Sequence, residues 1–367
     1  MTTVTLQADQ RLVTLDAGNG PAHFPLIWLR DNAPEGFHPQ TEERLFDLTS
    51  VPLDLSAEGA RVEGETLVID WDGDTSSRFD LAALMKVRPG SRRSDPAHIA
   101  PVTWRSDLGA GGIPRVSANA VMSDDAALQG WLASTRCYGI SIVEGLADTT
   151  EAGMDVARRI GFLRETNFGV TFEVISKPNP NNLAYTPVAL PLHTDLTNQE
   201  VPPGFQFLHC LANEATGGGS LFSDGYAIAE DLRQQDPEAF KLLSEVSIPF
   251  RFHDDSCDIR GRKHVITLNE DGEVTEFCFN AHLADVLDLD PEVMVPYYAA
   301  YRRIMEMTRD PKYLVTLKLK AGEMVVFDNR RALHGRQSFD PSTGRRHLHG
   351  CYVDRGEFDS RLRLLAR

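Results

Sequence analysis

The stretch Leu190-Pro191-Leu192-His193-Thr194-Asp195-Leu196 places a His-x-Asp pair at the end of a short apolar run. If the run is a strand, alternate side chains point to one face, so His193 and Asp195 lie side by side. An imidazole and a carboxylate are two of the three ligands of the two-His-one-carboxylate site for non-haem Fe(II). The spacing alone carries little weight, because His253-Asp254-Asp255 repeats it and such a pair is usually a surface turn. A third ligand must come from elsewhere in the chain.

A histidine that can complete the site lies far downstream, at His334. The apolar run 323–328 reads as a strand, and His334 follows it after a short turn. The chain therefore predicts a ligand set of His193, Asp195 and His334.

Arg346, twelve residues after His334, opens a strand that we expect over 346–353. Alternation along that strand groups on one face Arg346, Leu348 and Tyr352. An arginine on the inner face of a barrel requires an anion, since an unpaired buried charge is costly. A planar guanidinium holds a carboxylate in a bidentate fork, whereas the alternative is an internal Arg–Asp pair.

Strand signals recur along the whole chain, with few helices between them. We expect helices over 123–131, 149–163, 227–246 (with a break at Asp236-Pro237) and 291–307. We expect strands at 3–6, 11–15, 25–29, 66–71, 139–143, 205–211, 220–223, 246–252, 323–328 and 346–353. This pattern favours a mainly β fold with flanking helices, namely a double-stranded β-helix (jelly roll), over a doubly wound α/β fold.

Changes in composition along the chain predict its domain boundaries. Residues 1–95 read as a small β-rich N-terminal domain. Residues 96–114 are punctuated by proline and glycine and read as a linker. Residues 115–367 form the jelly-roll domain.

Composition excludes several classes of protein. The chain has 367 residues, is 42% apolar and 25% charged, and carries a net charge of −16, which argues against a nucleic-acid-binding surface. Its five cysteines are scattered without a Cys-x-x-Cys pair, which is typical of a reducing compartment. No signal peptide and no run of about 20 apolar residues is found. We expect a cytoplasmic protein without a membrane partner.

Together these motifs resemble the γ-butyrobetaine hydroxylase branch of the taurine-dioxygenase-like Fe(II)/2-oxoglutarate dioxygenases. The resemblance covers nearly the whole chain and rests on the stretches 28–32, 181–186, 192–195, 202–204, 208–210, 216–220, 327–330, 333–336 and 346–348. It implies that 2-oxoglutarate is decarboxylated to succinate with O₂ while an unactivated C–H bond is hydroxylated.

The resemblance also assigns roles by position. His193, Asp195 and His334 would bind Fe(II), and Arg346, helped by Ser220, would bind the distal carboxylate of 2-oxoglutarate. The family further implies a homodimer to which the N-terminal domain contributes.

Members of this branch hold a trimethylammonium group among aromatic rings, because a quaternary cation is attracted to ring faces. The substrate-binding positions here are Phe168, Phe172, Asn182, Tyr185 and Tyr352. For Phe168 and Phe172 an ordinary core role is the alternative.

The second amide that the branch uses for the substrate carboxylate falls at Ala281, next to His282. A different anionic group would explain this change. We therefore expect 2-(trimethylammonio)ethylphosphonate as the substrate, with γ-butyrobetaine as the alternative. A different substrate altogether, such as a sulfonate or an amino acid, and a non-catalytic jelly-roll binding or sensing module also stay open.

The branch often holds a structural zinc in its N-terminal module, through a Cys-x-Cys-x-x-Cys run and a later histidine. In this chain those cysteine positions are Ala33, Glu35 and His38, and residues 73–78 contain no histidine. The sequence therefore predicts no structural zinc.

Overall fold

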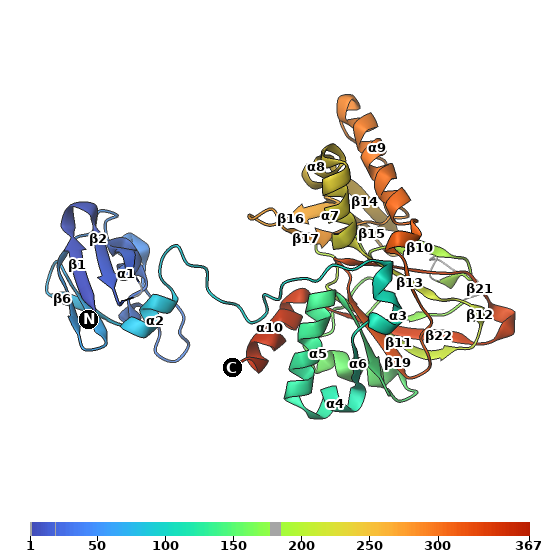
Figure 1. Cartoon of the computed structure of the whole chain (residues 1–367), viewed down its shortest axis with the longest axis horizontal. Helices are drawn as coiled ribbons and strands as arrows, with labels where there is room; N and C mark the ends of the chain where they lie inside the picture. The colour runs from blue at the N-terminus through green and yellow to red at the C-terminus, as the bar shows by residue number, and fades with distance from the viewer. Residues whose placement is uncertain (1, 19, 177–184) are drawn as a thin grey trace. The chain divides into compact units, whose positions relative to one another are not determined.

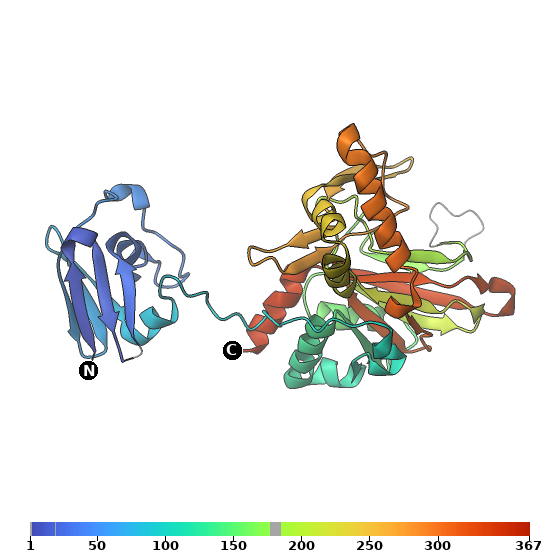
Figure 2. The same cartoon turned by 45° about the horizontal axis from the view of Figure 1, so that its top comes forward.

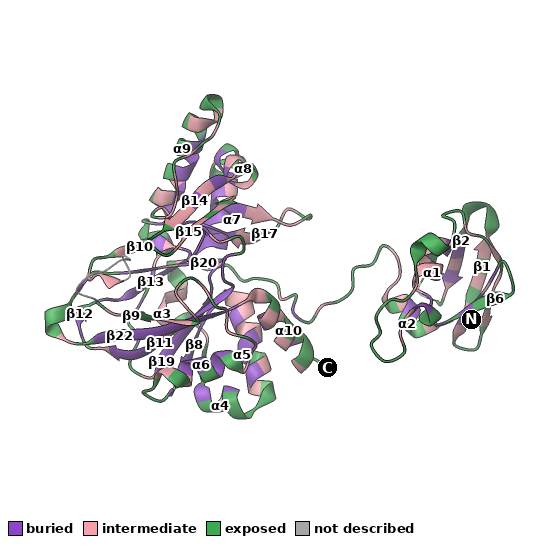
Figure 3. Cartoon of the chain, turned by 180° about the vertical axis from the view of Figure 1, so that it is seen from behind, coloured by how far each residue is buried: buried purple, intermediate pink, exposed green. Residues whose placement is uncertain are grey.

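The computed structural model describes residues 2–18, 20–176 and 185–367, and the chain divides into two compact units, Met1–Asp95 and Pro96–Arg367 (Figure 1). Each unit has its own buried core, as the purple segments in Figure 3 show.

The N-terminal unit is built from two antiparallel sheets. One contains β1 (Thr3–Gln7), β2 (Leu12–Asp16) and β3 (Pro21–Pro25), and the other β4 (Ala57–Glu63), β5 (Thr66–Trp71) and β6 (Thr75–Asp80). Alternate residues such as Val13 and Leu15 or Leu67 and Ile69 are fully buried and form its core. Helix α2 (Leu81–Lys86) follows β6, and the Asp80 side chain caps its N-terminus.

One predicted strand of this unit is wrong. Residues 25–29 do not extend β3; the chain turns at Pro25 into helix α1 (Leu26–Asp31). Leu26 and Leu29, three residues apart, are both buried, which is the spacing of one helix face. The core contact of that face outweighs the strand propensity of Ile27 and Trp28.

The second unit contains two facing sheets, which confirm the predicted jelly roll. The larger has the order β7-β8-β19-β11-β22-β9, with β7 (Arg115–Ser117), β8 (Ile140–Glu144), β9 (Thr171–Val174), β11 (Phe205–Asn213), β19 (Glu323–Asp328) and β22 (Arg346–Val353). The smaller has the order β10-β20-β13-β18, with β10 (Leu190–His193), β13 (Ser220–Asp224), β18 (Val315–Leu317) and β20 (Ala332–Arg336). Side chains of both sheets, among them Phe222, Phe327 and Leu348, share one core.

Helices cover the outer faces of these sheets (Figure 2). The larger sheet is covered by α5 (Asp125–Tyr138), α6 (Thr150–Arg158) and α10 (Arg355–Leu365), with α4 (Ala118–Ser123) beside them. Helix α3 (Gly109–Gly112) contacts β18 of the smaller sheet. The smaller sheet packs against α7 (Gly225–Gln235), α8 (Pro237–Glu245) and α9 (Pro291–Met307). The predicted break at Asp236-Pro237 is confirmed, because α8 begins at that proline.

Three two-stranded sheets complete the unit. Two of them are hairpins, which pair β14 (Ile248–His253) with β15 (Asp258–Lys263) and β16 (Ile266–Leu268) with β17 (Val274–Phe277). The third pairs β12 (Thr216–Gly217) with β21 (Phe339–Asp340), which lie far apart in the sequence. Among the described residues, no helix combines the length and apolarity that crossing a membrane requires.

Residues 96–114, which the sequence predicted as a linker, belong to the second compact unit. Trp104 is buried, and its Nε1 donates to the carbonyl oxygen of Tyr138 at 2.8 Å. The Val102 amide donates to the Cys137 carbonyl, and Arg331 donates back to the Val102 carbonyl. Proline and glycine broke the helix and strand patterns here, but the side chains between them anchor the segment to the second unit.

Candidate active site

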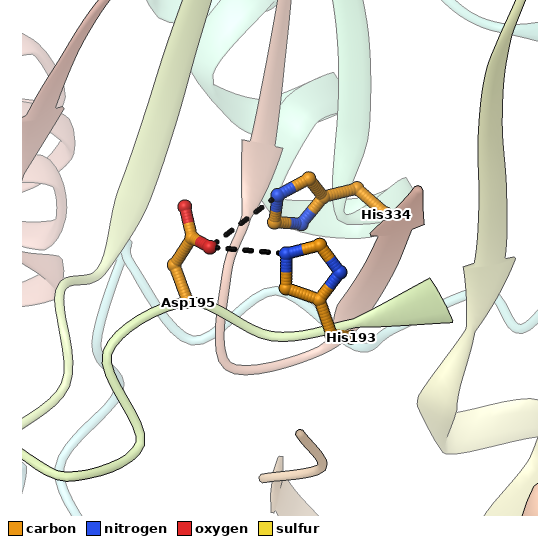
Figure 4. A group of neighbouring side chains, drawn as sticks. All are labelled: His193, Asp195 and His334. Atoms are coloured by element: carbon orange, nitrogen blue, oxygen red, sulfur yellow. Dashed lines mark ion pairs between the residues drawn. The ribbon is translucent and has the colours of Figure 1, made fainter. Parts of the chain in front are cut away.

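His193, Asp195 and His334 meet at one edge of the smaller sheet (Figure 4). His193 ends β10 and lies directly opposite His334 of β20 in the strand register. The Oδ1 atom of Asp195 is 3.3 Å from Nε2 of His193 and 3.6 Å from Nε2 of His334. The candidate ligand atoms lie within 4.8 Å of one another, and no other such group is found in the described part of the chain.

The two histidine rings have different surroundings. Nδ1 of His193 lies 2.8 Å from the Pro191 carbonyl oxygen, which can only accept, so the other nitrogen is free to face Asp195. Burial lowers the pKa of His334 to about 3. Burial also lowers the pKa of His193, but the hydrogen bond and charge of Asp195 outweigh it and leave that pKa raised.

Asp195 is the anionic member of the group. Burial raises the pKa of this carboxyl, but the charge of His334 and the hydrogen bond from His193 hold it well below its usual value. An ionised carboxylate beside two imidazoles is the donor set of a two-His-one-carboxylate Fe(II) site, so the residues fit that metal.

The backbone of Asp195 is fixed by Asn329, which the sequence did not single out. Oδ1 of Asn329 accepts from the Asp195 amide at 2.7 Å, and Nδ2 donates to the Asp195 carbonyl at 3.1 Å. Leu196, the next residue, has a left-handed φ of 56°, which is unfavourable for a branched side chain. Asn329 lies in the turn between β19 and β20, so it connects the segment of Asp195 to the segment that carries His334.

Arg346 lies at the start of β22 and is 8% exposed. No carboxylate of the described residues is within ion-pair distance of its guanidinium, whose Nε donates to the Gly218 carbonyl at 3.4 Å. Burial, with the neighbouring charge of Arg336, lowers the pKa of Arg346 to about 10, so it remains a cation at neutral pH. A buried cation without a carboxylate is suited to an anionic ligand, and the alternative of an internal Arg–Asp pair is not observed among the residues that the structure describes.

The glycine run before Ser220 shapes this end of the pocket. Gly218 has φ of 69°, and a Cβ there would lie 3.0 Å from Nε of Arg346. A side chain at this position would therefore press on the guanidinium. Ser220 is buried on β13, opposite Arg336 of β20.

Comparisons with known proteins agree with this geometry. The family model described as "Taurine catabolism dioxygenase TauD, TfdA family" matches residues 99–352. The chain belongs to this family. It is an Fe(II)- and 2-oxoglutarate-dependent dioxygenase, as the resemblance predicted, with Fe(II), 2-oxoglutarate and O₂ as its cofactor and co-substrates.

Relatives within the family are similar along almost the whole chain. The gamma-butyrobetaine dioxygenase of Pseudomonas sp. (strain AK-1) is 41% identical over 94% of this chain and 91% of its own length. The gamma-butyrobetaine dioxygenase of Homo sapiens is 30% identical over 93% of this chain and 91% of its own length. The mitochondrial trimethyllysine dioxygenase of Homo sapiens is 31% identical over 96% of this chain and 85% of its own length.

Solved structures support the fold. A taurine dioxygenase from Burkholderia xenovorans covers 70% of this chain and 90% of its own chain with a TM-score of 0.51 at 16% identity. An asparagine oxygenase in complex with Fe(II), 3-hydroxyasparagine and succinate covers 64% of this chain and 82% of its own chain, with a TM-score of 0.51 at 17% identity.

The structure brings part of the predicted substrate site together. The rings of Phe172 and Tyr352 are 5.0 Å apart, and the Tyr352 hydroxyl donates to Oδ2 of Asp195 at 2.7 Å. Gly350 lets this happen, because a Cβ there would collide with the ring of Phe172, its partner in the strand register. Tyr185 is half-buried and lies close enough to raise the pKa of Tyr352.

The other predicted substrate positions are not seen to join Phe172 and Tyr352. The ring of Phe168 packs edge-on against Phe252, with centroids 5.3 Å apart, and is half-buried. Asn182 lies outside the described residues. Ala281 and His282 line a cavity of about 270 Å³ together with Leu192 and Leu221. These leucines belong to the hydrophobic core between the smaller sheet and the helices that cover it.

Arg336 was missed by the sequence reasoning. It lies two residues after His334 on β20, so the two side chains share a face, and alternation was the signal that could have found it. Its guanidinium donates to the carbonyls of Thr186 and Val188, next to Tyr185. It therefore fixes the segment that enters the predicted substrate site.

The N-terminal positions of the family's zinc site have ordinary local roles. Ala33 is buried, Ser77 donates a hydrogen bond to Glu35, and the Thr41 amide donates to Nδ1 of His38 at 3.2 Å. The absence of zinc remains a prediction.

Proposed function

We propose that this protein hydroxylates γ-butyrobetaine, with His193, Asp195 and His334 as its Fe(II) ligands. The observation that carries this proposal is the 41% identity, over 94% of the chain, to a bacterial gamma-butyrobetaine dioxygenase. Bound iron would supply O₂ activation coupled to decarboxylation of 2-oxoglutarate, and the side chains around it bind and orient the two organic molecules.

The metal-binding role rests on the donor set. Nε2 of each histidine and Oδ1 of Asp195 converge on one point, and the carboxylate supplies the negative charge. Three protein ligands on one side leave the other side open for 2-oxoglutarate and O₂.

Arg346 is proposed to bind the distal carboxylate of 2-oxoglutarate, with the hydroxyl of Ser220 as a further donor. The guanidinium is buried and has no carboxylate partner among the described residues, and its fork matches a carboxylate. Ser220 pairs with Arg336, which lies two residues after His334 on the same strand, so a co-substrate held by Arg346 and Ser220 would lie near the strand that carries His334.

The trimethylammonium group is proposed to lie against Phe172 and Tyr352, with Tyr185, Phe168 and Asn182 as further substrate contacts. Each ring face attracts a cation by about 0.5–2 kcal/mol, depending on how far water is excluded. Because the Tyr352 hydroxyl touches Asp195, a cation at this ring lies beside the metal ligands. A substrate bound in this way would have a C–H bond near the proposed iron ligands.

The expected phosphonate substrate is not supported, and γ-butyrobetaine fits the relatives better. The relatives described above are gamma-butyrobetaine and trimethyllysine dioxygenases, and both substrates end in a carboxylate. Trimethyllysine is the second candidate, on the 31% identity to the human enzyme. Family membership also removes the reading of the chain as a non-catalytic module.

A substrate panel tests the proposal. It compares γ-butyrobetaine, trimethyllysine, 2-(trimethylammonio)ethylphosphonate and 4-aminobutyrate, which lacks the methyl groups, by succinate and by hydroxylated product. We expect γ-butyrobetaine to have the highest kcat/KM and 4-aminobutyrate to be a poor substrate. A kcat/KM for trimethyllysine or the phosphonate at least tenfold above that of γ-butyrobetaine would overturn the assignment.

We further propose that the enzyme is cytoplasmic, from its sequence, and that it forms a homodimer, as the family resemblance implies. Light scattering on the full chain in solution tests the second point.

A further inference from the structure

The two oxygens of Asp195 have different surroundings. Oδ1 faces both histidine rings, at 3.3 and 3.6 Å from their Nε2 atoms. Oδ2 accepts a hydrogen bond of 2.7 Å from the Tyr352 hydroxyl. Figure 4 shows both dashed lines ending on one oxygen, while the other oxygen points away from the rings. Oδ1 of the carboxylate thus faces the candidate metal position, and Oδ2 is bound to the tyrosine.

Tyr352 belongs to both halves of the site. It lies on β22 of the larger sheet, is 4% exposed, and faces the space between the two sheets. Its ring packs on Phe172 with centroids 5.0 Å apart. One buried side chain therefore contacts the candidate cation site with its ring and the candidate iron site with its hydroxyl.

The direction of the hydrogen bond is fixed by chemistry. An ionised carboxylate only accepts, so the tyrosine must donate. A hydrogen bond to a carboxylate is among the stronger ones in a protein, and it restrains rotation of the carboxylate about its Cβ–Cγ bond.

We propose that Tyr352 is a positioning residue that keeps Asp195 a one-oxygen ligand. With Oδ2 engaged, only Oδ1 is available to the metal, and the positions needed by 2-oxoglutarate and O₂ stay open. Without the hydroxyl, Oδ2 is free to turn toward the metal and compete for one of them. The cation role of the ring rests on the proposed function, whereas the role of the hydroxyl does not.

The test is Tyr352→Phe, which removes the hydroxyl and keeps the ring. Co(II) titration of the protein without substrate, followed by visible absorption, reports metal affinity and coordination number. We expect an altered Co(II) spectrum, because a second carboxylate oxygen would change the coordination number, and a metal affinity that changes by roughly 10–100-fold, as for other groups that orient a metal ligand. In turnover, kcat should fall while KM for γ-butyrobetaine changes less than about twofold, since the ring that attracts the cation remains.

Two variants separate this role from a structural one. Tyr313→Phe is the matched control, because the Tyr313 hydroxyl also donates to a carboxylate, Oδ2 of Asp231, at 2.8 Å in a buried setting. It should leave metal affinity, kcat and KM unchanged. Phe172→Leu should raise KM for γ-butyrobetaine and leave Co(II) affinity unchanged, which is the opposite pattern to Tyr352→Phe.

An unchanged Co(II) affinity and spectrum in Tyr352→Phe would overturn the proposal. If that variant does not fold, 4-fluorophenylalanine at position 352 fills the space of the hydroxyl without donating, and the same outcomes apply. Because the metal titration contains no substrate, a wrong substrate assignment would alter the KM results and leave the Co(II) result intact.

Discussion

His193-Thr194-Asp195 and His253-Asp254-Asp255 have the same His-x-Asp spacing but different surroundings. The first lies at the end of β10, with its side chains directed at His334 and its backbone fixed by Asn329. The second lies at the exposed end of β14, where Asp254 accepts from the amides of Ser256 and Cys257 and closes a hairpin turn. The difference shows that spacing places two side chains near each other, while burial and a third ligand turn them into a site.

The largest effect should separate the two pairs directly. His193→Ala removes an Fe(II) ligand and should lower kcat/KM by more than the roughly 10–100-fold typical of residues that only orient a ligand. His253→Ala, at an exposed hairpin, should leave turnover unchanged. Succinate formation with γ-butyrobetaine measures both, and equal losses in the two variants would contradict the assignment.

Arg346 is proposed to bind 2-oxoglutarate, which is needed at the His193–Asp195 site and not at the His253–Asp255 turn. Arg346→Ala should raise KM for 2-oxoglutarate by roughly 10–100-fold, since hydrogen bonds to charged groups contribute about 1.5–3 kcal/mol each. Arg345→Ala is the control, because Arg345 is the exposed neighbour and interacts with Nδ1 of His347. A KM that rises equally in both variants would refute the role of Arg346.

Asn329 holds the backbone of Asp195 in the His193–Asp195 pair, and no such asparagine contact is described for the His253–Asp255 turn. Asn329→Ala leaves the Asp195 amide without its acceptor, and we expect roughly 1–3 kcal/mol of lost stability per unsatisfied group. We also expect Co(II) affinity to fall by roughly tenfold. Asn269→Ala, which loses similar amide contacts in an exposed turn, should keep full affinity; thermal unfolding and Co(II) titration measure the two effects.

The smallest expected effect is the change in folding stability with pH that a buried histidine causes and an exposed one does not. His209 is 1% exposed, and burial followed by the charge of His349 lowers its pKa to about 4. The unfolded chain, with a histidine pKa of about 6.5, binds more protons in this window, so stability should fall on acidification from about pH 6.5 to 4. The contribution of one histidine is at most about 1.4 kcal/mol per pH unit.

His209→Leu should reduce this acid sensitivity, and His253→Ala should not. Chemical unfolding of the metal-free protein at pH 7 and pH 5 measures the difference. A steeper loss of stability in His209→Leu than in the wild type would contradict the sign.

The sequence predicted those features that depend on local pattern. The predicted neighbourhood of His193 and Asp195 is observed, although β10 ends at His193 and Asp195 lies in the turn that follows it. Alternation along β22 placed Arg346 on the same face as Tyr352. It failed where tertiary contacts decide, as in α1, whose Leu26 and Leu29 are buried together, and in the packed segment around Trp104.

The substrate was the weakest inference, because it rested on the absence of an amide at Ala281. A missing donor does not identify the anion that replaces a carboxylate. Asn329 and Arg336 were overlooked because their roles come from hydrogen bonds to segments far away in the sequence.

The most direct test of the iron site is the visible charge-transfer band of the Fe(II)–2-oxoglutarate chelate, recorded anaerobically. We expect the band in the wild type and in His253→Ala, and its loss in folded His193→Ala and His334→Ala. A folded wild-type protein without the band, or a band that survives in His193→Ala, would contradict the assignment of these residues as iron ligands.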